Sequence, residues 1–317
     1  MKNISKHGKN MGKKILNIGS ITKDCIITPH ETYNQIGGAV YYQLSTLNQL
    51  KVPNTSIILI GEDDLEMLNN LDEKTIKTIK TQKTMQYINK YDEDNNRTQK
   101  AYLPKEAITP EKIDINMNEY DTAIISPLSK YEIPIKTLKY IKEKNIETTL
   151  LIQGYVRDTD KNNNIIKRKW NNYDKYLKYT DILCCDEEEL KTALDKKQIT
   201  DEEIFNLIKK HNMKEIIITK SIHGSSIYTK TEKINIPCIK TENEIDHTGL
   251  GDTYITAYTY KKQETDIYTA GLFASITAKN KLETKGTLKS TKEEIENELD
   301  KILNQISQDN KWNHNCH

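Results

Sequence analysis

The fold of this protein is decided by the segment DHTGLGDTY, residues 246–254, which leads directly into an apolar stretch of helical character. Gly249 and Gly251 bracket a single residue, and Asp252 follows at once. Because glycine has no side chain, successive backbone N–H groups in such a turn can point toward one place. The start of a helix adds N–H groups without helical partners and the positive end of its dipole. The segment therefore predicts a cradle for an anion, with a carboxylate at its rim.

The spacing alone is compatible with two interpretations of Asp252. Beside a phosphoryl group in transfer, its carboxylate could accept the proton of an attacking hydroxyl while the amides stabilise the developing charge. Alternatively, Asp252 could be the N-cap of the helix, a position at which aspartate is common. Both interpretations predict that a helix starts here.

Apolar runs alternate with amphipathic stretches on the N-terminal side of this segment. Strands separated by helices of about ten or more residues require crossover connections, which predicts an α/β fold with a mostly parallel central sheet. In such open sheets the ligand site lies beyond the carboxyl ends of the strands. We expect helices at residues 39–50 and 135–144, and strands at residues 15–18, 57–60, 122–126, 148–152, 182–185 and 215–220.

A different pattern occupies residues 84–103. Two segments with strand character, residues 85–91 and 98–103, flank a polar turn at residues 92–97. This arrangement predicts a β-hairpin.

The composition excludes several classes of function. Lys and Arg number 47 against 46 Asp and Glu, a formal net charge of +1, so no overall field attracts nucleic acid or an anionic membrane. The five cysteines are odd in number and show no C-x-x-C spacing, which favours a reducing cytoplasm over a disulfide framework. No run approaches the roughly 20 apolar residues that span a bilayer, and the basic N-terminus lacks the apolar part of a signal peptide. We therefore expect a cytoplasmic protein.

Two familiar nucleotide-binding motifs are missing from the sequence. There is no G-x-x-x-x-G-K-[ST], so the phosphates are not held by a P-loop. No G-x-G-x-x-G opens the first helix, which disfavours a dinucleotide-binding dehydrogenase.

Residues 246–252 resemble the C-terminal signature of the ribokinase-like carbohydrate kinases, the pfkB family, which has the form Asp-Thr-x-Gly-x-Gly-Asp. The sequence matches it except that His247 replaces the first threonine. The resemblance implies a ribokinase-like three-layer fold with a small β lid, and Asp252 as the catalytic base. It also implies an anion hole built by the amides of Gly249, Leu250 and Gly251.

Landmarks near the N-terminus follow the order of the same family. Asp24 matches the aspartate after the first strand that holds substrate hydroxyls, and a carboxylate can accept from two of them. Gly37 and Gly38 resemble the paired glycines that let the backbone approach the substrate. The family's asparagine a few residues later is missing, and Tyr41 and Tyr42 stand in its place.

The phosphate and metal residues of the family also have counterparts. Glu189 matches the glutamate of its Asn-x-x-Glu motif and Asp186 replaces the asparagine, which implies a Mg²⁺ site. The same acidic run could instead be the first turn of a helix, favoured by the dipole. Thr219 and Gly224 resemble the nucleotide-binding Thr-x-Gly-x-x-Gly, in which Ser221 replaces the first glycine.

The resemblance implies two further contacts beside the anion hole. Family members often bind a monovalent cation such as K⁺ there, and Asp246 and Thr248 are the nearest counterparts in this sequence. Thr248 is also a candidate contact to ATP.

Two stretches are similar to the myo-inositol kinase branch and its archaeal relatives. They are residues 125–128, ISPL, and residues 151–157, LIQGYVR. Gln153 lies at a strand end where an amide could read substrate hydroxyls, and Arg157 could pair with a phosphate.

The sequence thus predicts an ATP- and Mg²⁺-dependent kinase that phosphorylates a hydroxyl of a sugar, an inositol-like polyol or a related small molecule. We expect a flexible tail at residues 1–12, a kinase domain at 13–308 and an irregular tail at 309–317. The lid is expected from residues 22–36 and 84–103, and it could pair two copies into a homodimer.

Two other functions are compatible with the same residues. A nucleoside kinase on this scaffold needs an aromatic shelf for the base, which Tyr41, Tyr42 or Tyr102 could supply. A degenerate member that binds ligand without turnover would explain the departures at His247 and Ser221 and the missing asparagine near Tyr41 and Tyr42. The intact Gly249, Gly251 and Asp252 of the signature argue against that second alternative.

Overall fold

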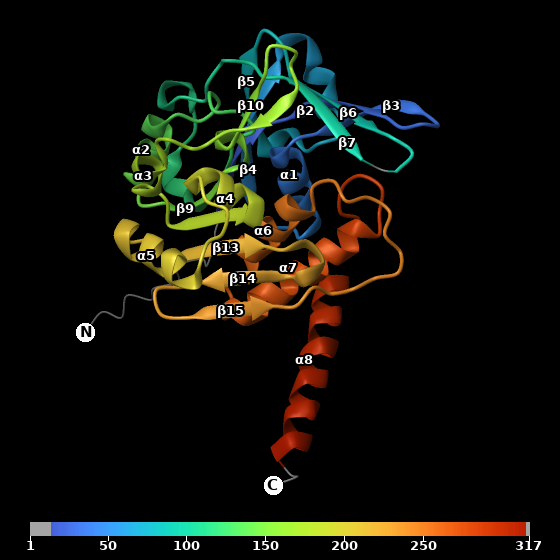
Figure 1. The fold of residues 1–317 in the computed structure, drawn as a ribbon, viewed down its shortest axis with the longest axis vertical. Coiled ribbons are helices and arrows are strands. Elements are labelled where there is room, and N and C mark those ends of the chain that lie inside the picture. Colours follow the sequence, from blue (N-terminus) through green and yellow to red (C-terminus); the bar gives the residue numbers. More distant parts are fainter. Residues whose placement is uncertain (1–13, 95, 315–317) are drawn as a thin grey trace, which may run out of the picture.

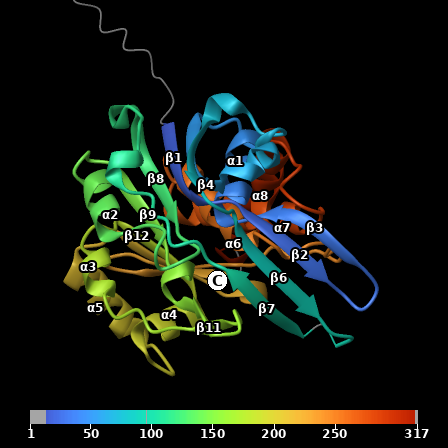
Figure 2. The ribbon, with the colours of Figure 1, turned by 90° about the horizontal axis from the view of Figure 1, so that it is seen from above.

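The computed structural model describes residues 14–94 and 96–314 (Figure 1). The tail expected at residues 1–12 lies outside this part of the chain. In the described part, helices cover both faces of a central sheet, and a second, smaller sheet projects from one side of the body (Figures 1 and 2).

The central sheet has nine strands among the described residues, in the order β15-β14-β13-β12-β9-β8-β1-β4-β5. The strands from β13 to β5 run parallel, whereas β14 and β15 are antiparallel additions at one edge. The prediction of a mostly parallel α/β sheet is confirmed. The strands are β1 Lys14–Ser20, β4 Asn54–Gly61, β5 Ile76–Thr81, β8 Tyr120–Ser126, β9 Glu147–Leu151, β12 Ile182–Asp186, β13 Glu215–Thr219, β14 Ser225–Tyr228 and β15 Lys233–Ile236.

Both faces of the sheet are buried, as is usual where crossover helices cover a parallel sheet. Every residue of β4 is buried. Along β1, Leu16 and Ile18 belong to one hydrophobic core and Ile15 to the other, because successive side chains of a strand point to opposite faces.

The helices divide between these two cores. Residues of α2 to α5 pack in the core that contains Leu16, and residues of α6 to α8 pack in the core that contains Ile15. The helices are α1 Ala39–Gln49, α2 Ile135–Lys142, α3 Tyr173–Leu177, α4 Glu187–Leu194, α5 Asp201–His211, α6 Leu250–Lys261, α7 Ile267–Leu282 and α8 Lys292–His314. Short 3₁₀ turns are η1 Glu62–Leu68, η2 Glu73–Thr75, η3 Pro110–Lys112, η4 Met117–Glu119, η5 Gln153–Tyr155 and η6 Ser221–His223.

The smaller sheet has the order β3-β2-β6-β7. Its β6 and β7 form the predicted antiparallel hairpin, and β2 pairs parallel with β6. Met85, Tyr87 and Ala101 of this sheet pack against Ala39 and Leu128 of the body, which anchors its base beside the central sheet (Figure 2). The strands are β2 Thr22–Ile27, β3 Thr32–Gly37, β6 Met85–Tyr91 and β7 Arg97–Tyr102; a separate ribbon pairs β10 Arg157–Thr159 with β11 Ile165–Lys167.

The C-terminal end differs from the prediction. We expected residues 309–317 to be irregular, but α8 continues to His314 and projects away from the body (Figure 1). The prediction is therefore wrong for residues 309–314, while residues 315–317 lie outside the described part. Ile295 and Leu299 in the N-terminal part of α8 are buried, and extending an existing helix costs far less than starting one.

A buried carboxylate supports the loop between β8 and α2. Glu132 is fully buried, and its Oε2 accepts from the backbone N–H of Leu128 at 2.7 Å. The carbonyl oxygen of Leu128 accepts from the Tyr87 hydroxyl of the smaller sheet at 3.4 Å. Glu132 therefore holds the segment on which the smaller sheet rests.

Glu132 makes the stability of the fold depend on pH. Burial raises its pKa from 4.5 to about 7, so between these values the folded chain keeps a proton that the unfolded chain has released. The free energy of unfolding then falls as pH rises through this interval, by about 3 kcal/mol for this group. We expect Glu132→Gln to remove this part of the decrease between pH 5 and pH 8 in urea unfolding. An unchanged pH dependence in the variant would contradict the assignment.

Candidate active site

The predicted site residues lie where the parallel strands end. Asp186 and Thr219 are the last residues of β12 and β13 and lie side by side in the sheet register. Gln153 follows the end of β9, and Asp24 lies in β2, which begins directly after β1. This is the edge of the sheet at which a ligand was expected.

Helix α6 begins at the glycine segment, as predicted. Its N-cap is Gly249, whose φ of +74° lies in the left-handed region that favours glycine. The first bond of the helix runs from the Thr253 N–H to the Gly249 carbonyl at 2.9 Å. The amides of Leu250, Gly251 and Asp252 precede that bond, so the helix offers them no acceptor. With the positive end of the dipole, they have the arrangement expected of an anion cradle.

Asp252 is the third residue of α6 rather than its N-cap. The cap is Gly249, and no side chain caps this helix, so the N-cap interpretation of Asp252 is wrong. Its half-buried position raises the pKa of Asp252 to about 6, and the positive charge of Arg157 opposes this rise. Such a carboxylate is mostly ionised at neutral pH yet basic enough to take up a proton.

The two glycines of the cradle are present for different reasons. At Gly249 a Cβ atom would lie 2.3 Å from the ring of Tyr42, so packing and backbone conformation both require glycine. At Gly251 a Cβ atom would meet nothing within 4 Å, and the residue is exposed. Because neither packing nor a positive φ requires glycine there, its bare backbone fits the close approach of a ligand.

Arg157 connects three of the predicted residues. With its amide oxygen turned toward the guanidinium, Gln153 accepts from Nη1 at 3.1 Å and from Nη2 at 2.9 Å. Nη2 also lies 3.6 Å from Oε1 of Glu189, and its charge acts on Asp252. Gln153 thus orients Arg157 toward two carboxylates, a contact that the sequence did not predict.

Asp186 and Glu189 form a reciprocal cap at the start of α4. The Glu189 N–H donates to Asp186 Oδ1 at 2.6 Å, and the Asp186 N–H donates to Glu189 Oε2 at 3.2 Å. The helix-start interpretation of this acidic run is confirmed. Burial and the charge of Asp186 raise the pKa of Glu189 to about 7, against the charge of Arg157.

The same two carboxylates fit a Mg²⁺ ion. Hard cations take carboxylate oxygens, and Mg²⁺ usually keeps several waters and binds through one or two carboxylates plus phosphates. Within residues 14–94 and 96–314, no cluster of three or more His, Cys, Asp and Glu side chains could hold an ion by itself. Asp186 and Glu189 would therefore hold Mg²⁺ together with water and the phosphates of the donor.

The paired glycines lie against Asp24. The Asp24 side chain is buried, and its Oδ1 accepts from the Thr22 hydroxyl at 2.7 Å. A Cβ atom on Gly37 would lie 2.3 Å from Asp24 Oδ2. Gly38 has a φ of +96°, and a Cβ atom there would lie 2.5 Å from the Ser20 carbonyl oxygen. Both glycines therefore allow the junction of β3 and α1 to approach the predicted substrate carboxylate.

Tyr42 is not part of an aromatic shelf. It is 2% exposed, and its ring packs beneath Gly249. Burial, followed by the charges of Asp246, Asp24 and Asp252, raises the pKa of Tyr42, so the phenol lies within the field of all three carboxylates. The expectation that Tyr42 could stack on a base is wrong, because its face is already covered.

The segment after β13 keeps its turn despite the missing glycine. Ser221 adopts a φ of 51°, the left-handed conformation that the family's glycine would take easily. The Lys220 N–H donates to the Gly224 carbonyl at 2.8 Å, and a Cβ atom on Gly224 would lie 2.0 Å from the Ile236 carbonyl oxygen. Thr219, the other predicted nucleotide contact, is half-buried at the strand end.

Asp246 ties the start of the glycine segment to its surroundings. Its Oδ1 accepts from the Thr248 N–H and its Oδ2 from the Gly286 N–H, both at 2.9 Å. His247, the departure from the family signature, is exposed and lies 3.3 Å from Glu244. The histidine is therefore paired with another exposed residue of the same loop.

A family model confirms what these residues indicate. The pfkB family carbohydrate kinase model matches residues 8–294. The chain belongs to the pfkB carbohydrate kinase family. It is accordingly a sugar or nucleoside kinase, a phosphotransferase that acts on a hydroxyl group.

This pfkB kinase is similar in sequence or in structure to several kinases. A segment of 73 residues is 45% identical to a nucleoside kinase of Methanocaldococcus jannaschii, and it spans 22% of this chain and 24% of that protein. A pyrophosphate-dependent kinase of the ribokinase family, solved with a pyrophosphate analogue and myo-inositol, is 23% identical with a TM-score of 0.73, covering 89% of this chain and 99% of its own. Ribokinase of Arabidopsis thaliana, solved with ribose and ATP, is 17% identical with a TM-score of 0.73, covering 91% and 99%. The two structural similarities establish a shared ribokinase-like fold.

Sequence reasoning missed Glu132 and Lys281 and gave Tyr42 the wrong role. All three residues act through contacts with distant segments of the chain. No local signal marks Glu132 or Lys281, since each lies in a stretch where a charged residue is ordinarily exposed.

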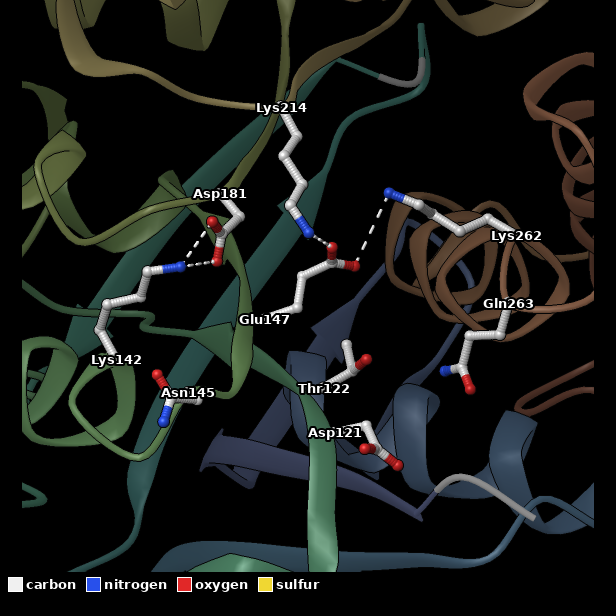
Figure 3. A pocket seen from close by; sticks show the side chains of 9 residues that line it. All are labelled: Asp121, Thr122, Lys142, Asn145, Glu147, Asp181, Lys214, Lys262 and Gln263. Atoms are coloured by element: carbon white, nitrogen blue, oxygen red, sulfur yellow. Dashed lines mark hydrogen bonds and ion pairs between the residues drawn. The ribbon is translucent and has the colours of Figure 1, made fainter. Parts of the chain in front are cut away.

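A cavity of about 480 Å³ lies at the opposite, amino edge of the sheet (Figure 3). Its lysines face carboxylates at distances that compensate their charge, so it lacks the net positive field that a phosphate donor needs. The pairs are Lys142 with Asp181 at 2.6 Å, Lys214 with Glu147, and Lys262 with Glu215 at 2.6 Å and with Glu147 at 3.7 Å.

Among the helices of the described residues, none combines the length and the apolar composition that a membrane-spanning helix requires.

The contrast between the two glycines gives a test of the cradle. We expect Gly251→Ala to fold with unchanged or slightly higher stability, by up to about 1 kcal/mol, because alanine favours the helix. Its methyl group would occupy the open space that we assign to the ligand, so kcat/KM should fall about 10²-fold, the scale of a lost oxyanion donor.

Gly249→Ala is the structural counterpart. We expect it to destabilise the fold by about 1–3 kcal/mol through its positive φ and the contact with Tyr42. Thermal unfolding and steady-state kinetics of both variants separate the two effects. Full activity of Gly251→Ala would argue against a ligand over this turn.

Proposed function

We propose that this kinase transfers the terminal phosphoryl group of ATP to a hydroxyl of a sugar or an inositol-like polyol, with Asp252 as the catalytic base. The observation that carries the proposal is the half-buried Asp252 carboxylate, with its pKa raised to about 6, in the first turn of a helix that begins at a bare glycine turn. A base and an anion cradle within one turn of helix are what in-line phosphoryl transfer requires.

The proposed reaction moves one proton and one phosphoryl group. The acceptor hydroxyl donates a hydrogen bond to the Asp252 carboxylate, and the proton passes to this carboxylate as the oxygen forms its bond to the γ-phosphorus. The bond from this phosphorus to the bridging oxygen breaks, and ADP leaves with the electron pair. The first-turn amides of α6 face the negative charge on the transferring oxygens.

Arg157 keeps the base ionised. Its guanidinium lies 3.6 Å from Glu189 and its positive charge lowers the pKa of Asp252 relative to burial alone. We assign Arg157 the further role of facing a phosphate oxygen of the donor, since its fork can serve a carboxylate and a phosphate together. When bound by Asp186 and Glu189, Mg²⁺ supplies positive charge that neutralises the donor phosphates.

Asp24 is the proposed acceptor-binding carboxylate. The negative charges of Asp24 and Asp252 both raise the pKa of the Tyr42 phenol, which supports the proposal that the two carboxylates face one site. In this site Asp24 would hold one end of a polyol while another hydroxyl meets Asp252. Closure of the smaller sheet over this site would exclude water, which competes with the acceptor for the phosphoryl group.

A nucleoside acceptor is the second candidate, favoured by the segment that is 45% identical to a nucleoside kinase. Of the three tyrosines considered, Tyr42 is buried, Tyr41 is half-buried and Tyr102 is 45% exposed. Tyr41 and Tyr102 therefore remain as candidates to stack on a nucleobase. The similarity to a pyrophosphate-dependent kinase makes pyrophosphate the alternative donor. Phosphorylation assays with inositol, ribose, fructose 6-phosphate and nucleosides, each with ATP and with pyrophosphate, discriminate among these reactions.

A non-catalytic role has little support from the departures that suggested it. His247 is exposed and paired with Glu244, outside the cradle. Ser221 adopts the left-handed conformation itself, so the turn before Gly224 keeps its geometry. Neither substitution disturbs Asp252.

Removing the base tests the mechanism directly. We expect Asp252→Asn to lower kcat by about 10²–10⁴-fold while the dissociation constant of ATP changes little, because the amide cannot accept the proton. Asp266→Asn is the matched control, since Asp266 caps α7 at a distance and asparagine caps equally well. Near-normal turnover by Asp252→Asn would remove the base assignment.

The raised pKa predicts the acid limb of the pH profile. Because the base acts as a carboxylate, kcat/KM should rise with pH below about 6, the pKa of Asp252, and level off above it. Arg157→Gln removes the positive charge that favours the carboxylate, so the midpoint should move to higher pH. Arg168→Gln, which changes an arginine 3.8 Å from Asp158, is the control and should leave the midpoint in place. A midpoint unaffected by Arg157→Gln would contradict the coupling.

A further inference from the structure

The end of α7 carries a fully buried lysine that contacts the glycine segment. Lys281 has no exposed surface, and its Nζ donates to the carbonyl oxygen of Asp246 at 2.7 Å. The same Nζ lies 3.2 Å from Asp246 Oδ2 and 5.7 Å from the centre of the Tyr42 ring. The ammonium group therefore lies between the first residue of the signature and the ring that supports Gly249.

Asp246 forms hydrogen bonds with both its side chain and its backbone. Besides its bonds to the Thr248 and Gly286 amides, its own N–H donates to the Leu282 carbonyl at 3.1 Å. Burial alone would raise the pKa of Asp246, but the two amides and the Lys281 charge bring it below its ordinary value. The residue is thus an ionised carboxylate whose position sets where the glycine segment starts.

The surroundings of Asp246 do not fit an alkali cation in addition to the Lys281 ammonium group. Such an ion binds to carbonyl and carboxylate oxygens, and the Lys281 ammonium group already donates to the Asp246 carbonyl oxygen and forms an ion pair with its carboxylate Oδ2. A second positive charge at this residue would be repelled by the ammonium group at close range in a medium of low dielectric constant. The K⁺ contact expected at Asp246 from the family resemblance therefore disagrees with the residues present.

Burying a lysine costs more free energy than filling the same space with an apolar side chain. Taking an ammonium group out of water costs several kcal/mol, and an apolar side chain of similar length would pack without that cost. Burial lowers the pKa of Lys281, and the Asp246 carboxylate opposes this change. The charge itself, rather than the volume of the side chain, accounts for lysine at this position.

We infer that Lys281 is a positioning residue that takes the place of the monovalent cation, holding residues 246–249 in the phosphate-receiving conformation with a charge that belongs to the chain. The inference rests on the proposed function, and it extends it to the control of the reaction. The contacts run from Lys281 to Asp246 on one side and through Tyr42 to Gly249 on the other. The kinase then turns over without any alkali cation.

The first experiment compares cations with the wild-type protein. We expect kcat with about 100 mM tetramethylammonium chloride as the only monovalent salt to lie within twofold of kcat when KCl replaces this salt at the same ionic strength. Activation by K⁺ of tenfold or more, at constant ionic strength, would overturn the inference.

The second experiment removes the charge. Lys281→Ala should lower kcat by about tenfold or more with little change in the acceptor KM, and added K⁺ or ethylammonium should restore part of the loss. Lys281→Arg, which keeps the charge, should need no added cation. Lys261→Met is the matched control, because Lys261 is also buried but pairs with Glu296 at 2.8 Å between α6 and α8. Its loss should lower the melting temperature without any rescue by K⁺.

A binding measurement separates this inference from the proposed function. In thermal unfolding at constant ionic strength, K⁺ should stabilise Lys281→Ala relative to tetramethylammonium and leave the wild-type melting temperature unchanged. This readout needs no turnover, so it stands even if no acceptor is phosphorylated. Should Lys281→Ala fail to fold, a K⁺-dependent melting temperature or kcat of the wild type would still overturn the inference.

Discussion

The left-handed turn at Gly249 is the constraint on which the site depends. It ends the loop that begins at Asp246 and starts α6, so three amides of the first helical turn have no helical acceptor. The Tyr42 ring lies against Gly249 where any side chain would stand, which fixes the turn from below. Because the ring belongs to α1, which follows β3 of the smaller sheet, the glycine segment and the smaller sheet share one support.

Charge balance governs the chemistry of this edge. Burial pushes the pKa values of Asp252 and Glu189 upward, and Arg157 pulls both of them down. Gln153 binds both terminal nitrogens of this guanidinium. A single cation therefore keeps two half-buried carboxylates, the proposed proton acceptor Asp252 and the proposed metal ligand Glu189, close to the point at which each can be ionised near neutral pH.

Buried charge also links the site to the stability of the fold. Glu132 supports the loop that carries the base of the smaller sheet, and Lys281 joins the end of α7 to the glycine segment. Groups of this kind cost free energy to desolvate, so they persist where they hold a particular geometry. Here Glu132 holds the segment that packs against the smaller sheet, and Lys281 holds the first residue of the glycine segment.

The sequence by itself determined the regular part of the architecture. Apolar runs, turn glycines and helical spacing depend on neighbours along the chain, which is why every parallel strand except β5, the 85–103 hairpin and the start of α6 were predicted close to their observed positions. The glycine signature was equally readable, because its conformational demand is local. Local patterns failed at the C-terminus, where α8 extends farther than its composition indicated.

Only the tertiary structure decided which side chains meet. Arg157 reaches Glu189 and acts on Asp252 across three elements, and Lys281 reaches Asp246 across 35 residues. It also decided that Tyr42 lies beneath the cradle instead of facing a substrate, and that Asp252 does not cap its helix. Burial and pairing are properties of the packed chain, since they depend on the surfaces that folding brings together, and no spacing within one segment encodes them.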